Sequence, residues 1–349
     1  MTTLPPRTRL TDLARHAGVS TATVSRVLNE KRGVSPRARE TVFAAIDSLG
    51  YERPDRLRER PVGLVVPELS DPVFPAFAQG IEKALSSRAY APLLCTQSPS
   101  GTTEDQYVEM LLGQAVDGIV FVSGLHADSS ASPERYRRLR RANVPFVVVN
   151  GRADGIEAPA VATDDAQAIE QAVRHLVSLG HRRIGLVIGP TRLIPTQRKR
   201  DAFCSLLAGQ DAADAPASHV VSTLFTVEGG QAAANDLLDS GHTAIVCTCD
   251  LMAIGALQAA QARGLRVPQD VSVVGFDDSP FAAFTDPPLT TIRQPVEAMG
   301  NAAVDALLSE IHGSPVSYAE MLFRPELVVR GSTHTAPRTG PATRERTRR

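Results

Sequence analysis

The chain of 349 residues lacks the common sequence motifs of an enzyme. It contains no P-loop, no Gly-x-Ser-x-Gly, no His-Glu-x-x-His, and no Gly-x-Gly-x-x-Gly that follows an expected strand. Its eight histidines are scattered along the sequence. We therefore expect a protein that is not an enzyme.

The sequence also lacks a hydrophobic run long enough to cross a membrane. Its longest apolar segments, such as residues 62–67 and 145–149, have the length of a strand, whereas a membrane-spanning helix needs about 20 apolar residues. The chain does not begin with a charged and then apolar leader that ends in a small-residue cleavage site. These absences predict a cytoplasmic protein without a membrane partner.

Cysteine is scarce, with four residues whose spacing shows no disulfide framework. Cys247 and Cys249 are separated by one residue at the end of an expected strand. No second Cys or His motif accompanies them, as a zinc site would require. We expect no metal site and no cofactor.

Charge is distributed unevenly along the chain. Residues 1–60 carry 12 Lys and Arg against 7 Asp and Glu, residues 61–334 carry 20 against 30, and residues 335–349 carry 5 against 1. A basic amino-terminal part on an acidic body is typical of a small module that binds a polyanion, attached to a larger part that does not bind DNA.

Residues 10–29 have the pattern of two short amphipathic helices. Apolar residues recur with helical spacing before and after a turn that contains Gly18. Ser20 is placed to cap the second helix by accepting a hydrogen bond from a backbone N–H two or three residues later. Such a pair is a helix-turn-helix, whose second helix can lie in the major groove of DNA. An ordinary helical hairpin has the same periodicity, but a third expected helix at residues 35–50 and the basic charge favour DNA binding.

The second helix leaves a short polar face that suits hydrogen bonds to base edges and phosphates. Arg26 and Asn29 are expected mainly to contact phosphates and to fix the position of the helix. Thr21, Ala22 and Thr23 are expected to select bases. The predicted DNA-contacting residues of this domain are Thr11, Ser20, Thr21, Ala22, Thr23, Ser25, Arg26 and Asn29.

From residue 62 onward, apolar strands alternate with helices. The expected strands are 62–66, 91–95, 118–122, 145–149, 184–188, 219–223, 243–247 and 271–276. The expected helices are 77–87, 104–114, 133–142, 165–179, 196–207, 229–238 and 251–262. Strands with continuous apolar runs between helices indicate parallel sheets covered on both faces. The predicted fold class is α/β: a small all-α domain, then two doubly wound lobes with a ligand crevice beyond the carboxyl ends of the strands.

Several segments carry a family resemblance. The pattern of the first domain is Asp12-Leu13-Ala14, Ala17-Gly18-Val19-Ser20 and Thr23-Val24-Ser25-Arg26-Val27-Leu28-Asn29. These residues resemble the amino-terminal segment of the lactose repressor/galactose repressor (LacI/GalR) family of bacterial transcription regulators. The resemblance extends to about residue 333, through segments such as Gly275-Phe276-Asp277-Asp278. The body is also similar to periplasmic sugar-binding proteins, so the resemblance implies a two-lobed, periplasmic-binding-protein-like effector domain.

The expected domain boundaries follow. Residues 1–50 form the helix-turn-helix domain, 51–61 a short basic linker, 62–334 the effector-binding and dimerisation domain, and 335–349 a disordered basic tail. In the resembled family the linker is a hinge helix whose leucine wedges into the minor groove. The linker here is shorter, and Leu57 is its only apolar candidate for such a wedge. A tether that contacts only phosphates is the alternative.

Polar and aromatic residues follow the expected strands, where a ligand in the crevice would be bound. Carboxylates that accept hydroxyl protons, a cationic donor and flat rings suit a sugar, a related polyol or a nucleoside. The predicted effector-binding residues are Asp71, Phe74, Asp164, Arg198, Lys199, Phe225, Asp250 and Asp277.

The resemblance adds roles for some of these residues. It implies that Asp71 binds hydroxyls beside an aromatic ring, and that Arg198 or Lys199 takes the place of an effector-binding arginine. Each residue also has a structural alternative. Asp164 and Asp250 can cap helices, and the aromatic rings can belong to the core.

Together these observations predict a repressor that binds a pseudo-palindromic operator as a homodimer in the nucleoid and responds to a small effector. One small DNA-binding domain buries too little surface for tight specific binding, and this argues for a dimer. A solute-binding receptor and an enzyme on a doubly wound scaffold are the alternatives. The basic amino-terminal domain argues against the first, and the missing catalytic motifs argue against the second.

Overall fold

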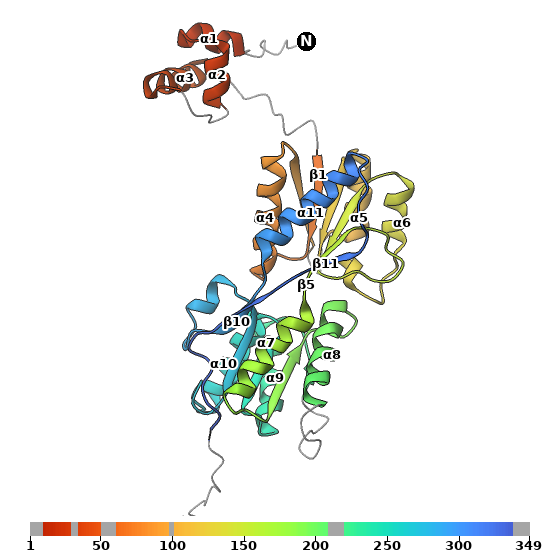
Figure 1. Ribbon diagram of the computed structural model, residues 1–349, viewed down its shortest axis with the longest axis vertical. Helices are drawn as coiled ribbons and strands as arrows, with labels where there is room; N and C mark the ends of the chain where they lie inside the picture. The colour runs from red at the N-terminus through yellow and green to blue at the C-terminus, as the bar shows by residue number, and fades with distance from the viewer. Residues whose placement is uncertain (1–9, 29–33, 50–60, 98–100, 209–219, 338–349) are drawn as a thin grey trace, which may run out of the picture. The chain divides into compact units, whose positions relative to one another are not determined.

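The computed structural model describes residues 10–28, 34–49, 61–97, 101–208 and 220–337 (Figure 1). The chain divides into two compact units, residues 1–56 and 57–349. The predicted linker lies almost wholly outside the described residues, and so does Leu57. The predicted disordered tail begins too early, because the backbone N–H of Ala336 still donates to Leu179 O at 2.8 Å.

The first unit contains three helices, α1 (Leu10–Ala17), α2 (Thr21–Leu28) and α3 (Pro36–Leu49). Their apolar faces meet in one small core of buried residues: Leu13, Ala14, Ala17, Val24, Val27, Val42 and Ala45. A hydrogen bond of 3.1 Å between His16 Nε2 and Ser48 Oγ joins α1 to α3. The predicted three-helix domain is therefore present.

The second unit contains two lobes, each built on a six-stranded sheet. The sheet of the amino-terminal lobe has the order β11-β5-β4-β3-β1-β2, and all of its pairings are parallel. Its strands are β1 (Pro61–Val66), β2 (Ala91–Thr96), β3 (Gly118–Val122), β4 (Phe146–Val149), β5 (Ala160–Thr163) and β11 (Glu320–Phe323). Its helices are α4 (Val73–Ser87), α5 (Glu104–Gly113), α6 (Glu134–Arg141), α11 (Val296–Ile311) and the short 3-10 helix η2 (Leu125–Ala127).

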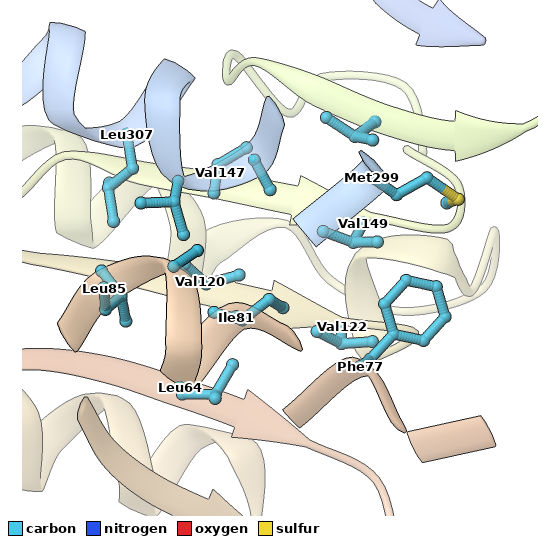
Figure 2. Close-up of a cluster of buried hydrophobic side chains, with 14 of the residues drawn as sticks. Leu64, Phe77, Ile81, Leu85, Val120, Val122, Val147, Val149, Met299 and Leu307 are labelled. Atoms are coloured by element: carbon cyan, nitrogen blue, oxygen red, sulfur yellow. The ribbon is translucent and has the colours of Figure 1, made fainter. Parts of the chain in front are cut away.

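Alternate residues of these strands point to opposite faces of the sheet, and each face is covered by helices. Figure 2 shows Leu64, Val120 and Val147 on one face of the sheet, where they form a cluster with Leu85 of α4 and Leu307 of α11. The opposite face packs against α5 and α6. This arrangement explains the uninterrupted apolar runs, because both faces of each central strand are buried.

The carboxy-terminal lobe repeats the plan with the strand order β12-β10-β9-β8-β6-β7, in which only β12 is antiparallel. Its strands are β6 (Ile184–Ile188), β7 (Val220–Ser222), β8 (Ala244–Cys247), β9 (Ser272–Asp277), β10 (Thr290–Arg293) and β12 (Glu326–Val328). Its helices are α7 (Asp165–Ser178), α8 (Ile194–Ala208), α9 (Val227–Asp239), α10 (Asp250–Ala262) and the 3-10 helix η4 (Pro280–Ala283). The α7 and α8 helices share one core and α9 and α10 another.

The chain crosses between the lobes three times: from β5 to α7, from β10 to α11, and from β11 to β12. As a result, α11 and β11 belong to the amino-terminal lobe although they follow the other lobe in sequence (Figure 1). The predicted α/β class with two doubly wound lobes is confirmed. The sequence interpretation did not resolve β5, and it ended before β10, α11, β11 and β12.

Candidate functional site

The turn between α1 and α2 has the geometry that a helix-turn-helix requires. Gly18 adopts a φ of +64°, a left-handed conformation that glycine reaches without strain. The backbone N–H of Val19 donates to Ala14 O at 3.0 Å, which closes α1. Ser20 Oγ accepts from the N–H of Thr23 at 3.1 Å, so Ser20 caps α2 as expected.

The outward face of α2 carries the residues predicted to contact DNA. Thr21, Ala22 and Arg26 are exposed, whereas Thr23 and Ser25 are half-buried. Thr11 at the start of α1 is also exposed. Asn29 lies outside the described residues. The described face is therefore short, polar and basic, as a surface for base edges and phosphates should be.

The second candidate site is a cavity of about 280 Å³ between the two lobes. It is lined from the amino-terminal lobe by Pro67, Glu68, Asp71, Val73, Phe74, Ser123, Ala127 and Asn150. It is lined from the carboxy-terminal lobe and its crossing by Asp165, Leu193, Pro195, Thr196, Lys199, Phe225, Thr248, Cys249, Phe276, Asp277 and Gln294. Most of these residues follow the carboxyl end of a strand or begin the next helix, where parallel sheets bind ligands.

Two carboxylates contribute to the cavity wall from opposite lobes. Asp71 Oδ1 accepts from the N–H of Val73 at 3.2 Å, and burial raises the pKa of Asp71. Asp277 Oδ1 accepts from Gln294 Nε2 at 2.6 Å. Burial raises the pKa of Asp277 well above its ordinary value, and the negative charges of Asp71 and Asp250 raise it further. Hydroxyl donors of a ligand would relieve this cost, because a hydrogen bond to a carboxylate stabilises its charged form.

Lys199 reaches the cavity with its charge already compensated. Its Nζ lies 2.6 Å from Asp165 Oδ1 and 4.3 Å from the centroid of the Phe276 ring. Both partners of the ion pair are buried. The pair therefore presents a fixed donor and acceptor rather than a mobile charge.

Five of the eight predicted effector-binding residues line the cavity: Asp71, Phe74, Lys199, Phe225 and Asp277. Phe225 does so from beyond the end of β7 rather than from the strand itself.

The structure places the other three elsewhere. Asp164 caps α7 by accepting from the N–H of Gln167 at 3.0 Å. Arg198 forms a two-bond ion pair with Glu320 of the amino-terminal lobe, with distances of 3.1 and 2.7 Å. Asp250 is buried, and it accepts from Thr291 Oγ1 and from the N–H of Ser279, both at 2.6 Å. These three residues therefore have other partners in place of the cavity.

The sequence interpretation missed several polar residues of the cavity wall. One of them is Asp165, the first residue of α7. Asp164 caps this helix, and Asp165, one position later, points in a different direction and lines the cavity. Asn150 follows β4, and its Nδ2 donates to Ser123 Oγ at 3.2 Å. Its position after an expected strand was a signal that could have identified it. Gln294 lies in a crossing that the sequence pattern did not resolve.

We expect Asp250 to make stability depend on pH. Burial raises its pKa to about 6 despite the hydrogen bonds from Thr291 and Ser279. Between these two pKa values the folded protein holds a proton that the unfolded chain has lost. The contribution of Asp250 to the free energy of unfolding is therefore at its maximum below the unfolded pKa of about 4, and it is lost as the pH rises through about 6. In urea unfolding from pH 4 to 7, wild type should lose up to roughly 3 kcal/mol relative to Asp250→Asn. If the free energies of unfolding of the two proteins changed with pH in the same way, the role of Asp250 would be contradicted.

Within the described residues, no group of three or more His, Cys, Asp and Glu side chains could hold a metal ion. No helix among them is long and apolar enough to span a membrane.

Comparison with known proteins assigns both domains. Residues 9–54 match the sequence profile of the bacterial regulatory proteins of the lacI family. Residues 173–333 match that of the periplasmic binding protein-like domain. The HTH-type transcriptional regulator MalR of Streptomyces coelicolor is 56% identical over 336 residues, which cover 95% of this chain and 98% of MalR.

Solved structures agree over nearly the whole length. A complex of the transcriptional regulator CelR with cellobiose matches with a TM-score of 0.70 and 35% identity, covering 93% of this chain and 100% of CelR. The Lac repressor dimer bound to operator and the anti-inducer ONPF matches with a TM-score of 0.71 and 27% identity, covering 94% and 100%. These relatives are regulators rather than enzymes. The chain therefore belongs to the LacI family of bacterial transcriptional regulators, with a helix-turn-helix DNA-binding domain and a periplasmic-binding-protein-like domain.

Proposed function

We propose that this regulator represses transcription by binding a pseudo-palindromic operator as a homodimer, and that a small sugar in the interlobe cavity controls it. The observation that carries the proposal is the joint presence of an exposed polar face on α2 and a cavity between two lobes that combines carboxyl groups with aromatic rings. The first suits base and phosphate contacts, and the second suits a hydroxyl-rich ligand.

The cavity chemistry supports a sugar or a related polyol. Asp71 and Asp277 offer acceptors for hydroxyl protons from opposite lobes, and Phe74 and Phe225 offer flat apolar surfaces. The related CelR forms a complex with cellobiose. A nucleoside would use the same acceptors and rings, so it is the second ligand class for the test.

The hydrogen bonds around Asp277 support a route from ligand to lobe geometry. Asp277 accepts from Gln294 in the β10–α11 crossing, and Gln294 Oε1 accepts from Thr163 Oγ1 at 2.6 Å. Thr163 ends β5, directly before another crossing. A ligand bound to Asp277 thus acts on two crossings, and it shifts the lobes only as far as its affinities for the two lobe arrangements differ.

Exposed aromatic rings support association of two copies. Phe281 and Phe284 of the carboxy-terminal lobe are 56% and 86% exposed. Both come from one turn, since the N–H of Phe284 donates to Phe281 O at 2.9 Å. We propose that a second copy of the chain covers these rings, as burial of apolar surface from water favours association. A two-fold dimer would present paired α2 helices to two half-sites.

The proposal is tested by selecting binding sites from random DNA duplexes, with wild type and Phe284→Glu. Wild type should sediment as a dimer and enrich a pseudo-palindrome, and a panel of sugars and nucleosides that includes cellobiose should contain a ligand that changes its operator affinity. The variant should sediment as a monomer and lose operator affinity by at least about 100-fold, because each copy then binds alone. Enrichment of an asymmetric site, or a wild-type monomer on DNA, would contradict the dimer. A panel without effect would contradict the effector assignment.

A further inference from the structure

The edge of the effector cavity is bridged by direct contacts between the lobes. Asp128 of the amino-terminal lobe forms an isolated antiparallel bridge with Leu193 of the carboxy-terminal lobe. The N–H of Ser129 donates to Arg192 O at 2.9 Å, and Ser129 Oγ donates to the same oxygen at 2.8 Å. We call these four residues the clasp.

A buried carboxylate reinforces the clasp. Asp128 Oδ2 accepts from Arg192 Nε at 2.7 Å, and the Asp128 side chain is only 8% exposed. Its other oxygen accepts from the N–H and Oγ of Ser130 at 2.9 and 2.6 Å. Burial alone would raise the pKa of Asp128, but the hydrogen bonds from Ser130 and the charge of Arg192 outweigh burial and lower it. The interlobe bond is therefore a charge-assisted hydrogen bond.

The clasp lies at the wall of the cavity. Leu193 itself lines the cavity, and so does Ala127, the residue before Asp128. The Asp128–Arg192 pair therefore joins two parts of the wall that belong to different lobes. Separation of the lobes at this edge requires the ion pair and three hydrogen bonds of Ser129 to break. Two of them go to Arg192 O, and Ser129 Oγ accepts the third from Gln197 Nε2 at 3.2 Å.

Each half of the clasp is held firmly in its own lobe. On the amino-terminal side, Glu104 Oε2 accepts from the N–H of Leu125 at 2.9 Å, and His126 Nε2 donates to Val149 O at 2.9 Å. Both Glu104 and His126 are buried. On the carboxy-terminal side, Gln197 Nε2 donates to Thr191 O at 2.9 Å. Each segment therefore moves with its own lobe, and the contacts between the two segments break when the lobes separate.

We propose that Asp128 and Arg192 act as positioning residues that keep the cavity closed, and that this pair sets how long a bound effector is retained. This inference rests on the proposed function in one respect, namely that the effector occupies this cavity. The closed clasp itself is a property of the free protein and can be measured without any ligand.

The first experiment measures amide hydrogen exchange of the full-length protein without added sugar. In Arg192→Gln and in Asp128→Asn, the Ser129 amide should exchange at least about fivefold faster, since each change removes the charge-assisted bond. The side-chain carbonyl introduced by Asp128→Asn can still accept from Ser130, so this variant separates the ion pair from the local turn. The double variant should exchange no faster than the faster single variant, because both changes remove the same bond.

The matched control is Arg200→Gln. Arg200 lies in α8, the helix that begins just after Arg192, and it pairs with its neighbour Asp201 at 2.7 Å rather than with the other lobe. The control should leave the exchange of the Ser129 amide unchanged. Equal exchange in wild type and in both clasp variants would overturn the inference, whether or not a sugar binds.

The second experiment measures rates with radiolabelled cellobiose or, if another member of the sugar panel binds instead, with that sugar. Both clasp variants should release it about fivefold faster than wild type, with an association rate and a sugar-free operator affinity within about twofold. A merely structural defect would also lower operator affinity or the melting temperature. Unchanged release rates in both variants would overturn the role in retention. If no sugar binds wild type, the proposed function fails and the exchange experiment still decides on the clasp.

Discussion

Replacing Arg26 with alanine should weaken operator binding by roughly 10- to 100-fold per half-site, because a hydrogen bond from a charged donor contributes about 1.5–3 kcal/mol. Arg26 lies in the last turn of α2 and is exposed beside the polar face that Thr21 and Ala22 begin. A phosphate contact from this position would fix the helix in the groove, so its loss should affect all operator sequences similarly. A gel-shift titration at matched salt measures the change.

The matched control is Arg37→Ala in α3, which removes the same charge from another exposed arginine of the same unit. Arg37→Ala should weaken operator binding far less than Arg26→Ala, because we expect the position of the arginine rather than the net charge of the domain to determine operator affinity. Effector affinity should stay within about twofold in the Arg26 variant, roughly 0.4 kcal/mol. Equal operator affinity of Arg26→Ala and wild type would contradict the assignment of α2 as the DNA-contacting helix.

The second large effect is expected for Asp277→Ala, which should abolish the effector response while operator binding survives. The substitution removes a carboxylate from the cavity wall and leaves Gln294 Nε2 without its acceptor. We expect effector affinity to fall by at least about 100-fold, since a carboxyl acceptor for the ligand and the hydrogen bond between Asp277 and Gln294 are lost together. Titration calorimetry with the effector, and operator binding with and without it, measure the two properties.

The variant should remain folded. Burial and the nearby Asp71 and Asp250 raise the pKa of Asp277, so its charged form destabilises the empty protein at neutral pH. Asp239→Ala, a change at an ion-paired surface residue of the same lobe, is the control and should leave the response intact. Asp277→Asn should be intermediate, because its carbonyl can still accept from Gln294. A normal response in Asp277→Ala would contradict the assignment of the cavity.

Regular elements could be predicted from the sequence where packing and periodicity agree. The central strands β3 and β6 are apolar throughout and buried on both faces, and their predicted bounds are identical to those observed. The short edge strands β11 and β12 gave no such signal. Two of the four residues of β11, Met321 and Leu322, are 40% and 55% exposed, so pairing rather than burial defines the strand.

The cavity was predictable as a place but not residue by residue. The rule that ligands lie beyond the carboxyl ends of strands led to Asp71 and Asp277, and both line the cavity. It could not decide between Asp164 and Asp165, or between Arg198 and Lys199, because neighbouring positions on a helix differ in direction by about 100°. Only the three-dimensional structure shows that Arg198 pairs with Glu320 on the other lobe.

The three crossings also determine the order in which the protein can be made. One face of the amino-terminal sheet is covered by α4 and α11 together, and Met299 and Leu307 of α11 pack on Val120, Val147 and Val149 (Figure 2). A ribosome must therefore synthesise every strand and helix of the carboxy-terminal lobe except β12 before that face can be fully covered. The core of the amino-terminal lobe is therefore completed only after most of the carboxy-terminal lobe has been made. A gene truncated after β5 would yield a fragment whose apolar sheet face is partly exposed to water, rather than a folded amino-terminal lobe.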